Sequence, residues 1–424
     1  MMRRFWIYFL GCILAATGYA QEKPKLSPLA IEPDWHQLDA FQGKITRAEF
    51  QERLEKIYSF DGGFKPFFEI NNQECTVYRD KQHQFPLWKV RFRGPNDVPF
   101  SAVRTHLQTP LPDKPLSGLT ICLDPGHIGG EWSRMEERFF VLKKDRPIRE
   151  AELNLWTCQR LAPLLEQAGA QVVWTKTSLK PVTSRRPLDL RKEASALLLE
   201  KRPELAKHLS NPRIQQEIDR QSKFLFYRIA EIQARATKID QLKPDLTLCV
   251  HYNADEWGNP DRPTLLDKNR LVIFAHGCYL ARELEYDDQK FYLLKKLFAN
   301  NSSFEVSLAE SIANEMKIQW GWLPEDYKSG RIARRTQENS YVWYRNLMAS
   351  RIFNSPVVFI EGPYMNDRNV YKRLAMGDYE GQRMVDGVMR ESIFREFAEI
   401  IAGGLTRFYS TRTSTLASAQ SEHF

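Results

Sequence analysis

The sequence has few cysteines and lacks the compact motifs by which many metalloenzymes are recognised. Its 424 residues include six cysteines, no two of which form a CxxC pair, and no HExxH motif is present. Without Cys12, which lies in a cleavable N-terminal segment described below, an odd number remains. A chain of this length can fold without disulfides, so we expect buried single thiols and not a disulfide framework.

The N-terminal apolar run is too short for a comfortable transmembrane helix. Two arginines precede the run, which extends from Phe5 to Tyr19 and ends at Ala20. A basic start, a short apolar stretch and a small-residue end are typical of a secretory signal peptide. We therefore predict that residues 1–20 are cleaved and that the protein is exported to the periplasm or the extracellular side. The residues before Cys12 form a poor lipidation motif, and lipid anchoring there stays open.

Neither sign of charge dominates the chain. The 61 basic residues face 53 acidic ones, which leaves a formal net charge of +8. An excess of this size fits a solvated basic surface, and it also fits attraction to a polyanion such as a cell-wall polymer. Charge alone does not choose between these two interpretations.

Proline-rich stretches and changes in residue pattern divide the chain into segments. Thr46 followed by Glu49 has the spacing of a capping box and predicts a helix start, with short strands after it. This first folded region shows no catalytic grouping. The predicted segments are a linker at 21–34, a small α+β accessory domain at 35–110, a catalytic domain at 117–409 with a helical insertion at about 185–227, and a disordered tail at 410–424.

Three apolar strands of the predicted catalytic domain each lead to a residue that could bind a metal or move a proton. The strands at 119–123, 246–250 and 356–360 are followed by His127, His251 and Glu361, respectively. A strand, a helix and a second strand around residues 119–175 form a βαβ unit, which implies parallel pairing. We predict a three-layer α/β/α fold with a mostly parallel twisted sheet, whose carboxyl strand ends share one rim.

Two histidines and one carboxylate are the usual ligands of a catalytic zinc ion, with a fourth position left for water. Glu150 begins the helix after the first strand and can return to the same rim, although Glu152 lies close by on that helix. A further acid is needed to accept the proton of the water and to pass it to the leaving amine. Glu361 can fill this role.

The same residues lie in motifs that resemble those of the zinc-dependent N-acetylmuramoyl-L-alanine amidases, the type 3 cell-wall hydrolases. Residues 123–130 (LDPGHIGG) resemble the DPGHGG motif, and residues 150–155 (EAELNL) resemble EKDLNL. Residues 250–254 (VHYNA) are similar to the second histidine motif, and residues 359–367 (FIEGPYMND) to the final glutamate motif, with Pro363 in place of the usual second glycine.

The resemblance covers about residues 117–409 and implies one zinc ion held by His127, Glu150 and His251, with Glu361 as the catalytic base. It implies cleavage of the amide between N-acetylmuramic acid and L-alanine in peptidoglycan. Asp124 and Asn253 are candidates for supporting the ligands or the substrate, and Asp124 could equally serve the turn before Pro125. We expect a monomer with peptidoglycan as its substrate, without nucleic acid or a stable membrane span.

Several features depart from the compact family pattern. The loop from Ile128 to Arg149 is long and could attract peptide carboxylates, or could be an ordinary solvated loop. Its basic residues are Arg134, Arg138, Lys143, Lys144, Arg146 and Arg149. Either the insertion at about 185–227 or the segment 255–270 could cover the site and regulate access. A regulatory protein partner is also possible.

Two other functions share part of this evidence. A zinc carboxypeptidase acting on peptidoglycan stem peptides would use the same metal ligands, but the order of the motifs and the residues in them favour the amidase. A non-catalytic wall-binding protein would bind without turnover, and it has no reason to keep all four groups.

Overall fold

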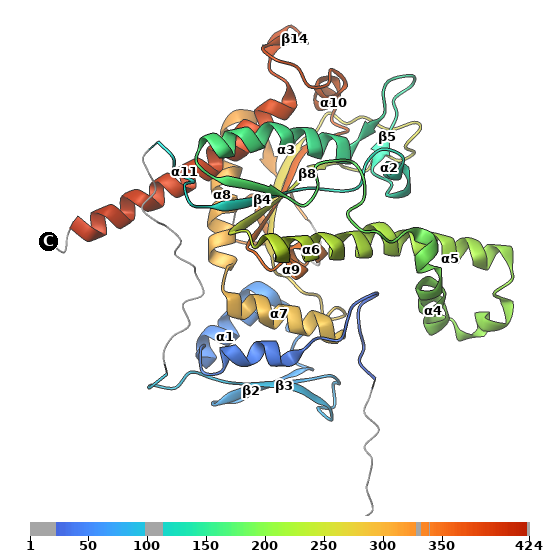
Figure 1. The fold of residues 1–424 in the computed structure, drawn as a ribbon, viewed down its shortest axis with the longest axis vertical. Coiled ribbons are helices and arrows are strands. Elements are labelled where there is room, and N and C mark those ends of the chain that lie inside the picture. The colour runs from blue at the N-terminus through green and yellow to red at the C-terminus, as the bar shows by residue number, and fades with distance from the viewer. Residues whose placement is uncertain (1–22, 98–112, 328–331, 339, 422–424) are drawn as a thin grey trace, which may run out of the picture.

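The structure is a computed structural model, and it describes residues 23–97, 113–327, 332–338 and 340–421 (Figure 1). The predicted signal peptide at 1–20 and Cys12 lie outside these residues, as does most of the proline-rich stretch after the accessory domain. Within the described residues, no helix combines the length and the apolar character needed to cross a bilayer. The five cysteines that the structure describes are buried free thiols, as predicted.

An eight-stranded mixed sheet forms the centre of the larger part of the molecule. Its strand order is β11-β12-β9-β13-β8-β4-β7, and β10 pairs with β9 beside β12. The four strands from β13 to β7 are mutually parallel, whereas β9 is antiparallel to β13. The strands are β4 (Thr120–Pro125), β7 (Gln171–Trp174), β8 (Leu246–Asn253), β9 (Arg270–His276), β10 (Leu323–Pro324), β11 (Arg334–Arg335), β12 (Val342–Arg345) and β13 (Val357–Tyr364).

Helices cover both faces of this sheet (Figure 1). One face carries α3 (Glu150–Gln167), α8 (Ser302–Trp320) and α11 (Ile393–Ser421), and the other carries α6 (Glu231–Leu242) and α9 (Met348–Ile352). Strands buried on both sides need apolar residues at successive positions, which explains the continuous apolar runs of β4, β8 and β13. The predicted three-layer α/β/α fold with a mostly parallel sheet is confirmed.

The last helix is longer than the sequence predicts. The pattern of residues from Ile393 to about Tyr409 predicts a closing helix, which Gly403 and Gly404 could end early, and the tail from Ser410 is predicted to be disordered. Instead, α11 continues through both glycines to Ser421. Gly404 lets α11 approach α8, because a Cβ there would lie 2.5 Å from Ile312 Cα. Extending an existing helix costs far less than nucleating one, so the weak helix formers after Tyr409 can continue it.

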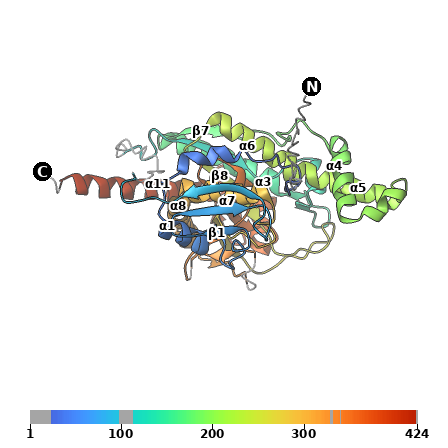
Figure 2. The same cartoon turned by 90° about the horizontal axis from the view of Figure 1, so that it is seen from below.

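A small unit with its own antiparallel sheet precedes the catalytic layers. It contains η1 (Trp35–Phe41), α1 (Arg47–Arg53), η2 (Leu54–Tyr58), β1 (Phe68–Ile70), β2 (Glu74–Tyr78) and β3 (Pro86–Arg91). The predicted capping box of Thr46 and Glu49 is present at the start of α1. The unit lies against α7 (Asp287–Ala299), and the two share one hydrophobic core (Figure 2).

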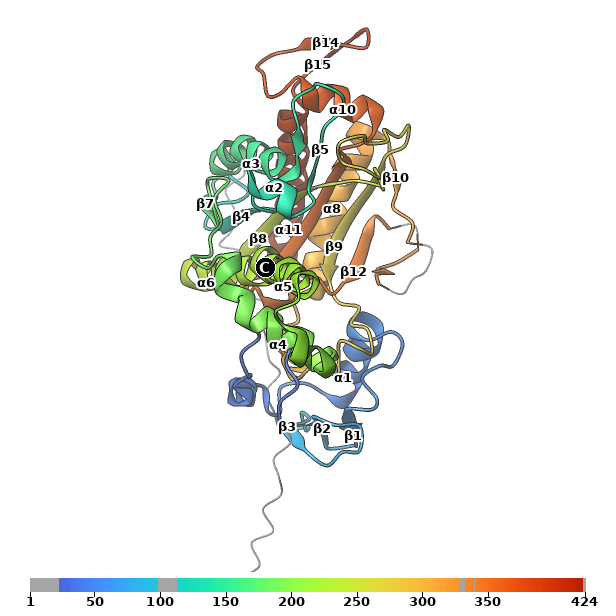
Figure 3. The same ribbon diagram turned by 90° about the vertical axis from the view of Figure 1, so that its right-hand side faces the viewer.

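The inserted region forms a helical arm that projects from the side of the molecule (Figures 1 and 3). Its elements are η3 (Pro187–Leu190), α4 (Arg191–Lys201), η4 (Pro203–His208), α5 (Pro212–Phe224) and η5 (Leu225–Ala230), which continues into α6. The arm has a small core of its own, which also contains Ile128 from the loop 128–149, called the site loop below. Shorter elements complete the fold: α2 (Trp132–Met135), β5 (Phe139–Phe140), β6 (Ile148–Arg149), α10 (Arg368–Ala375), β14 (Arg383–Val385) and β15 (Val388–Arg390).

Candidate functional site

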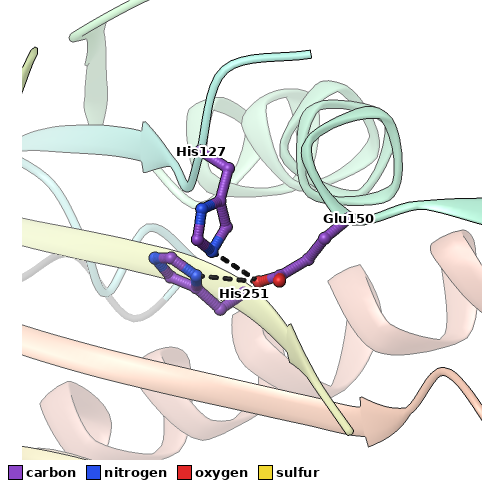
Figure 4. A group of neighbouring side chains, drawn as sticks. All are labelled: His127, Glu150 and His251. Atoms are coloured by element: carbon purple, nitrogen blue, oxygen red, sulfur yellow. Dashed lines mark hydrogen bonds and ion pairs between the residues drawn. The ribbon is translucent and has the colours of Figure 1, made fainter. Parts of the chain in front are cut away.

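Three side chains from separate parts of the sequence meet at the carboxyl end of the sheet (Figure 4). His127 Nε2 lies 3.1 Å from Glu150 Oε1, and His251 Nδ1 lies 3.0 Å from the same oxygen. One ligand atom from each of the three residues lies within 4.8 Å of the others. Among the described residues, these three form the only cluster of three or more His, Cys, Asp or Glu side chains that could hold a metal ion.

Each of these residues occupies a structurally defined position. His127 follows the end of β4, His251 lies near the end of β8, and Glu150 is the first residue of α3. Because β4 and β8 are parallel neighbours, their carboxyl ends meet at one rim, and α3 starts there. Glu152, which the sequence leaves as an alternative to Glu150, forms ion pairs with Arg146 and Arg149 and does not join the group.

The backbone of His127 has a φ of +61°, a left-handed conformation that residues other than glycine seldom adopt. Its carbonyl oxygen accepts hydrogen bonds from Arg235 Nη2, at 2.8 Å, and from Lys176 Nζ. Arg235 also donates to Asp124, which accepts a second bond from Thr175 Oγ1. An unfavourable backbone conformation persists only where surrounding contacts fix it. The hydrogen bonds from Arg235 and Lys176 provide such contacts and hold the His127 loop in place.

A second buried carboxylate lies on the other side of the His127 ring. Glu136 Oε2 is 3.6 Å from His127 Nδ1 and accepts a hydrogen bond from the backbone N–H of Ile128. The ring therefore presents Nε2 to Glu150 and Nδ1 to Glu136. A metal-binding histidine commonly has a carboxylate at its other nitrogen, which fixes its orientation and tautomer. This arrangement fits a metal-binding role for His127.

The His251 ring is held between a glycine and an aromatic ring. It stacks on Phe359 with centroids 4.3 Å apart. On its other side Gly126 approaches so closely that a Cβ there would lie 2.1 Å from His251 Cε1. The position of the His251 ring therefore requires a glycine at 126. The sequence alone does not reveal this requirement, because the two residues are far apart in the chain.

The charges in the group favour a bound cation. Burial lowers the pKa of His127, but the carboxylates of Glu150 and Glu136 outweigh it and raise this pKa to about 9. Burial raises the pKa of Glu150, whereas the two histidines outweigh this effect and hold it well below its usual range. A carboxylate that stays ionised in a buried place needs a positive partner, and a divalent metal would supply one.

Glu361 lies on β13 in register with His251 on β8. Residues opposite each other on adjacent strands face the same side of a sheet, so Glu361 points to the same side of the sheet as His251, one of the three residues that could hold the metal. Burial and the negative charge of Glu150 raise the pKa of Glu361 to about 8. A carboxyl group with a pKa near neutrality can both accept and donate a proton at working pH.

A cavity of about 1190 Å³ opens above these residues, and all four of them line it. The site loop contributes Arg138, the inserted arm contributes Tyr227 and Arg228, and β12 contributes Arg345. Asn253 also lines the cavity, and its side-chain oxygen accepts a bond from the backbone of Ala254. The inserted arm therefore borders the candidate site and does not lie apart from it.

The arginines of the loop 128–149 fall into two groups, and its two lysines, Lys143 and Lys144, are exposed. Arg134 and Arg138 line the cavity, whereas Arg146 and Arg149 pair with Glu152. Sequence reasoning did not find the roles of Glu136, Lys176 and Arg235. Their contacts with Asp124 and with His127 join distant or irregular parts of the chain, and no local sequence pattern signals them.

Histidines and carboxylates converge at the carboxyl strand ends of a three-layer α/β/α domain, an arrangement that could hold a metal ion. The family model described as N-acetylmuramoyl-L-alanine amidase (Amidase_3) matches residues 121–390. The chain belongs to this family, and it is an enzyme of this class. The resemblance inferred from the motifs is thereby confirmed.

Comparison with solved structures finds several amidases at low similarity. The CwlD amidase from Clostridioides difficile, solved with the GerS lipoprotein, is 16% identical with a TM-score of 0.38, and the match covers 69% of this chain and 100% of that one. AmiC2 of Nostoc punctiforme is 17% identical with a TM-score of 0.36, covering 69% and 98%. Ami1 from Mycobacterium smegmatis is 12% identical with a TM-score of 0.37, covering 70% and 99%. No curated protein matches the chain significantly.

Proposed function

We propose that this protein is an exported zinc hydrolase that cleaves the amide bond between N-acetylmuramic acid and L-alanine in peptidoglycan. His127, Glu150 and His251 would hold the zinc ion, and Glu361 would act as general base and then general acid. Membership of the amidase family supports the substrate. The observation that carries the mechanism is the pair of histidine nitrogens directed at one oxygen of Glu150, within reach of a single ion.

Zinc, when bound, would make water more acidic and polarise the scissile carbonyl. The chain's own residues supply the remaining parts. Glu361, in register with His251, takes the proton of the attacking water and returns it to the departing alanine nitrogen. Glu136 and the network of Asp124, Lys176 and Arg235 keep His127 in its orientation.

Export and location at the cell wall are part of the proposal, and they follow from the predicted signal peptide and from the position of the substrate. A monomeric state and a regulatory protein partner are further parts of the proposal. The inserted arm is where such a partner could act, because it borders the cavity.

A muropeptide digest tests the reaction. Purified sacculi are incubated with the protein, with protein treated with a chelator, and with treated protein to which zinc is returned. We expect free stem peptides that begin with L-alanine in the first and third reactions alone. Shortened stems still joined to sugar would identify a carboxypeptidase, and binding without any cleavage would identify a wall-binding protein.

Two variants separate metal binding from proton transfer. Glu361→Gln should retain zinc and lose at least about a hundredfold in rate, the usual contribution of general acid–base catalysis. His251→Ala should lose both zinc and activity, whereas His208→Ala, on the exposed end of η4, should lose neither. Cleavage by the Glu361→Gln protein at the wild-type rate would contradict the assigned mechanism.

A further inference from the structure

Three arginines from three separate elements line the cavity beside the candidate metal site. Arg138 comes from the site loop, Arg228 from the inserted turn η5, and Arg345 from the end of β12. Their charges act on one another: the pKa of Arg228 is lowered by partial burial and by the positive charges of Arg138 and Arg345. Like charges gathered in one place raise the free energy of the protein unless an anion joins them.

Carboxylates such as Glu136 and Glu361 also line this cavity, so these arginines differ from the other basic residues of the region in their close partners and not in their surroundings. Across the described parts of the chain, neither Arg228 nor Arg345 forms an ion pair with a carboxylate. Arg345 instead lies over the ring of Phe274, with its guanidinium carbon 5.2 Å from the ring centroid. Arg138 has a carboxylate neighbour, Glu150 Oε2, but at 3.6 Å and on a residue assigned to the metal. Other arginines of the region are paired, as Arg134 is with Asp261.

The cluster adjoins the reacting groups. The positive charges of Arg345 and Arg138 both act to lower the pKa of Glu361, against the larger effects of burial and of Glu150. A bound peptide whose scissile carbonyl lay between Glu361 and the metal-type group would therefore place its next residues within the cavity that the arginines line. Guanidinium groups bind carboxylates through paired, charge-assisted hydrogen bonds.

We propose that Arg138, Arg228 and Arg345 form a subsite for the free α-carboxylate of the second stem residue, D-glutamate, and that the inserted arm contributes to specificity through Arg228. The proposal rests on the proposed amidase function. The α-carboxylate of D-glutamate lies one residue beyond the L-alanine whose amide is cleaved. A subsite for it should therefore lie next to Glu361, in the cavity that the three arginines line. Where that carboxylate is converted to an amide, the subsite loses the charge it is built to neutralise.

The test uses two purified muropeptides that differ only in this group, one with D-glutamate and one with D-isoglutamine. For the wild-type enzyme loaded with zinc, kcat/KM should be about tenfold or more higher on the carboxylate form, as expected for hydrogen bonds to a charged group. Arg228→Gln should remove most of this preference, by lowering kcat/KM on the carboxylate form alone. Arg345→Gln should also reduce the preference, and its effect through the pKa of Glu361 should be shared by both substrates.

Arg282→Gln is the matched control, because Arg282 is an exposed arginine that lines the same cavity from the segment between β9 and α7. It should keep the wild-type preference. Arg138 is left unchanged, since its guanidinium also lies beside Glu150. Zinc content and the thermal midpoint of each variant show whether the site and the fold are retained.

Equal cleavage of the two substrates by the wild-type enzyme would overturn the inference while leaving the proposed function intact. So would an equal loss on both substrates in Arg228→Gln with normal zinc content. If neither substrate is cleaved, the proposed function fails, and calorimetry with the dipeptides L-alanyl-D-glutamate and L-alanyl-D-isoglutamine decides the subsite separately. Preferred binding of the acidic dipeptide by wild type, and not by Arg228→Gln, would support it; equal binding would refute it.

Discussion

At the scale of single residues, the site depends on small clearances as much as on ligands. Gly126 is the clearest case, because a side chain there would meet the His251 ring at 2.1 Å. The ring cannot retreat, since Phe359 stacks on its other face. We expect Gly126→Ala to displace His251 and to weaken zinc binding by about tenfold to a hundredfold, the range seen when groups that orient a ligand are removed.

Competition with a chromophoric chelator measures this affinity. Gly403→Ala, at a helical position where a Cβ would meet nothing closer than Glu315 at 3.8 Å, is a suitable control and should bind zinc as the wild type does. A Gly126→Ala protein with normal zinc affinity would show that the His251 position is more adaptable than the structure indicates.

Glu361 also carries a prediction about pH. Its pKa rises from an ordinary 4.5 to about 8 in the folded, metal-free protein, chiefly because of burial. Between these values the folded state holds a proton that the unfolded chain has released, so stability falls as pH rises through this window. Glutamine does not titrate. Glu361→Gln should therefore stabilise the metal-free protein at pH 8, by at least about 1 kcal/mol, and much less at pH 5.

Thermal unfolding in the presence of a chelator, at pH 5 and at pH 8, provides the measurement. A difference between variant and wild type that is the same at both pH values, or larger at pH 5, would falsify the assignment of a protonated Glu361. Bound zinc should reduce the difference, because a nearby cation favours the ionised carboxylate.

At the scale of elements, the sequence predicts those parts of the site that follow from strand geometry. Buried parallel strands are continuously apolar, so β4, β8 and β13 and the residues at their ends could be located. The supporting groups could not, because their contacts join distant elements. Arg235 reaches Asp124 across 111 positions of the sequence, and no local pattern encodes such a pair. The short strands β11 and β12 escaped prediction for a related reason, since β12 is defined by its pairing with β9, and β11 by its pairing with β12.

The two glycines of α11 illustrate how a local signal can have a tertiary cause. Gly403 and Gly404 suggest a helix end, yet only Gly404 faces the backbone of α8 at Ile312. Gly404→Ala should force the two helices apart and cost about 1–3 kcal/mol, as overpacking of a core does. Gly403→Ala meets nothing closer than 3.8 Å and should be neutral or stabilising by up to about 1 kcal/mol, because alanine is the better helix former.

Denaturant unfolding of the two single variants compares these positions directly. Equal effects at both sites would mean that helix propensity, and not the contact between α11 and α8, decides the role of the pair. Ser311 Oγ donates to the carbonyl oxygen of Gly404, so loss of that bond would accompany any separation of the helices.

At the scale of the whole molecule, the N-terminal unit shares a core with α7, which lies between β9 and α8 in the chain, and this predicts that the unit unfolds together with the catalytic layers. Phe298 on α7 is buried, stacks on Phe41 at 4.9 Å and lies 5.9 Å from Trp88, both of which belong to the N-terminal unit. Phe298→Ala should lower the free energy of unfolding by about 3–5 kcal/mol, the usual cost of removing a buried phenylalanine. Leu188→Ala, at an exposed position, should change it little.

Cooperativity is the decisive part of this prediction. Far-ultraviolet circular dichroism follows the helices, which lie mainly in the catalytic layers, and zinc release follows the site at the sheet rim. If the shared core couples the two units, Phe298→Ala shifts both transitions by the same amount, although the substitution lies away from the metal ligands. Unfolding of the N-terminal unit at a lower temperature, with zinc still bound, would show that the unit is an appendage and that α7 is stable without it.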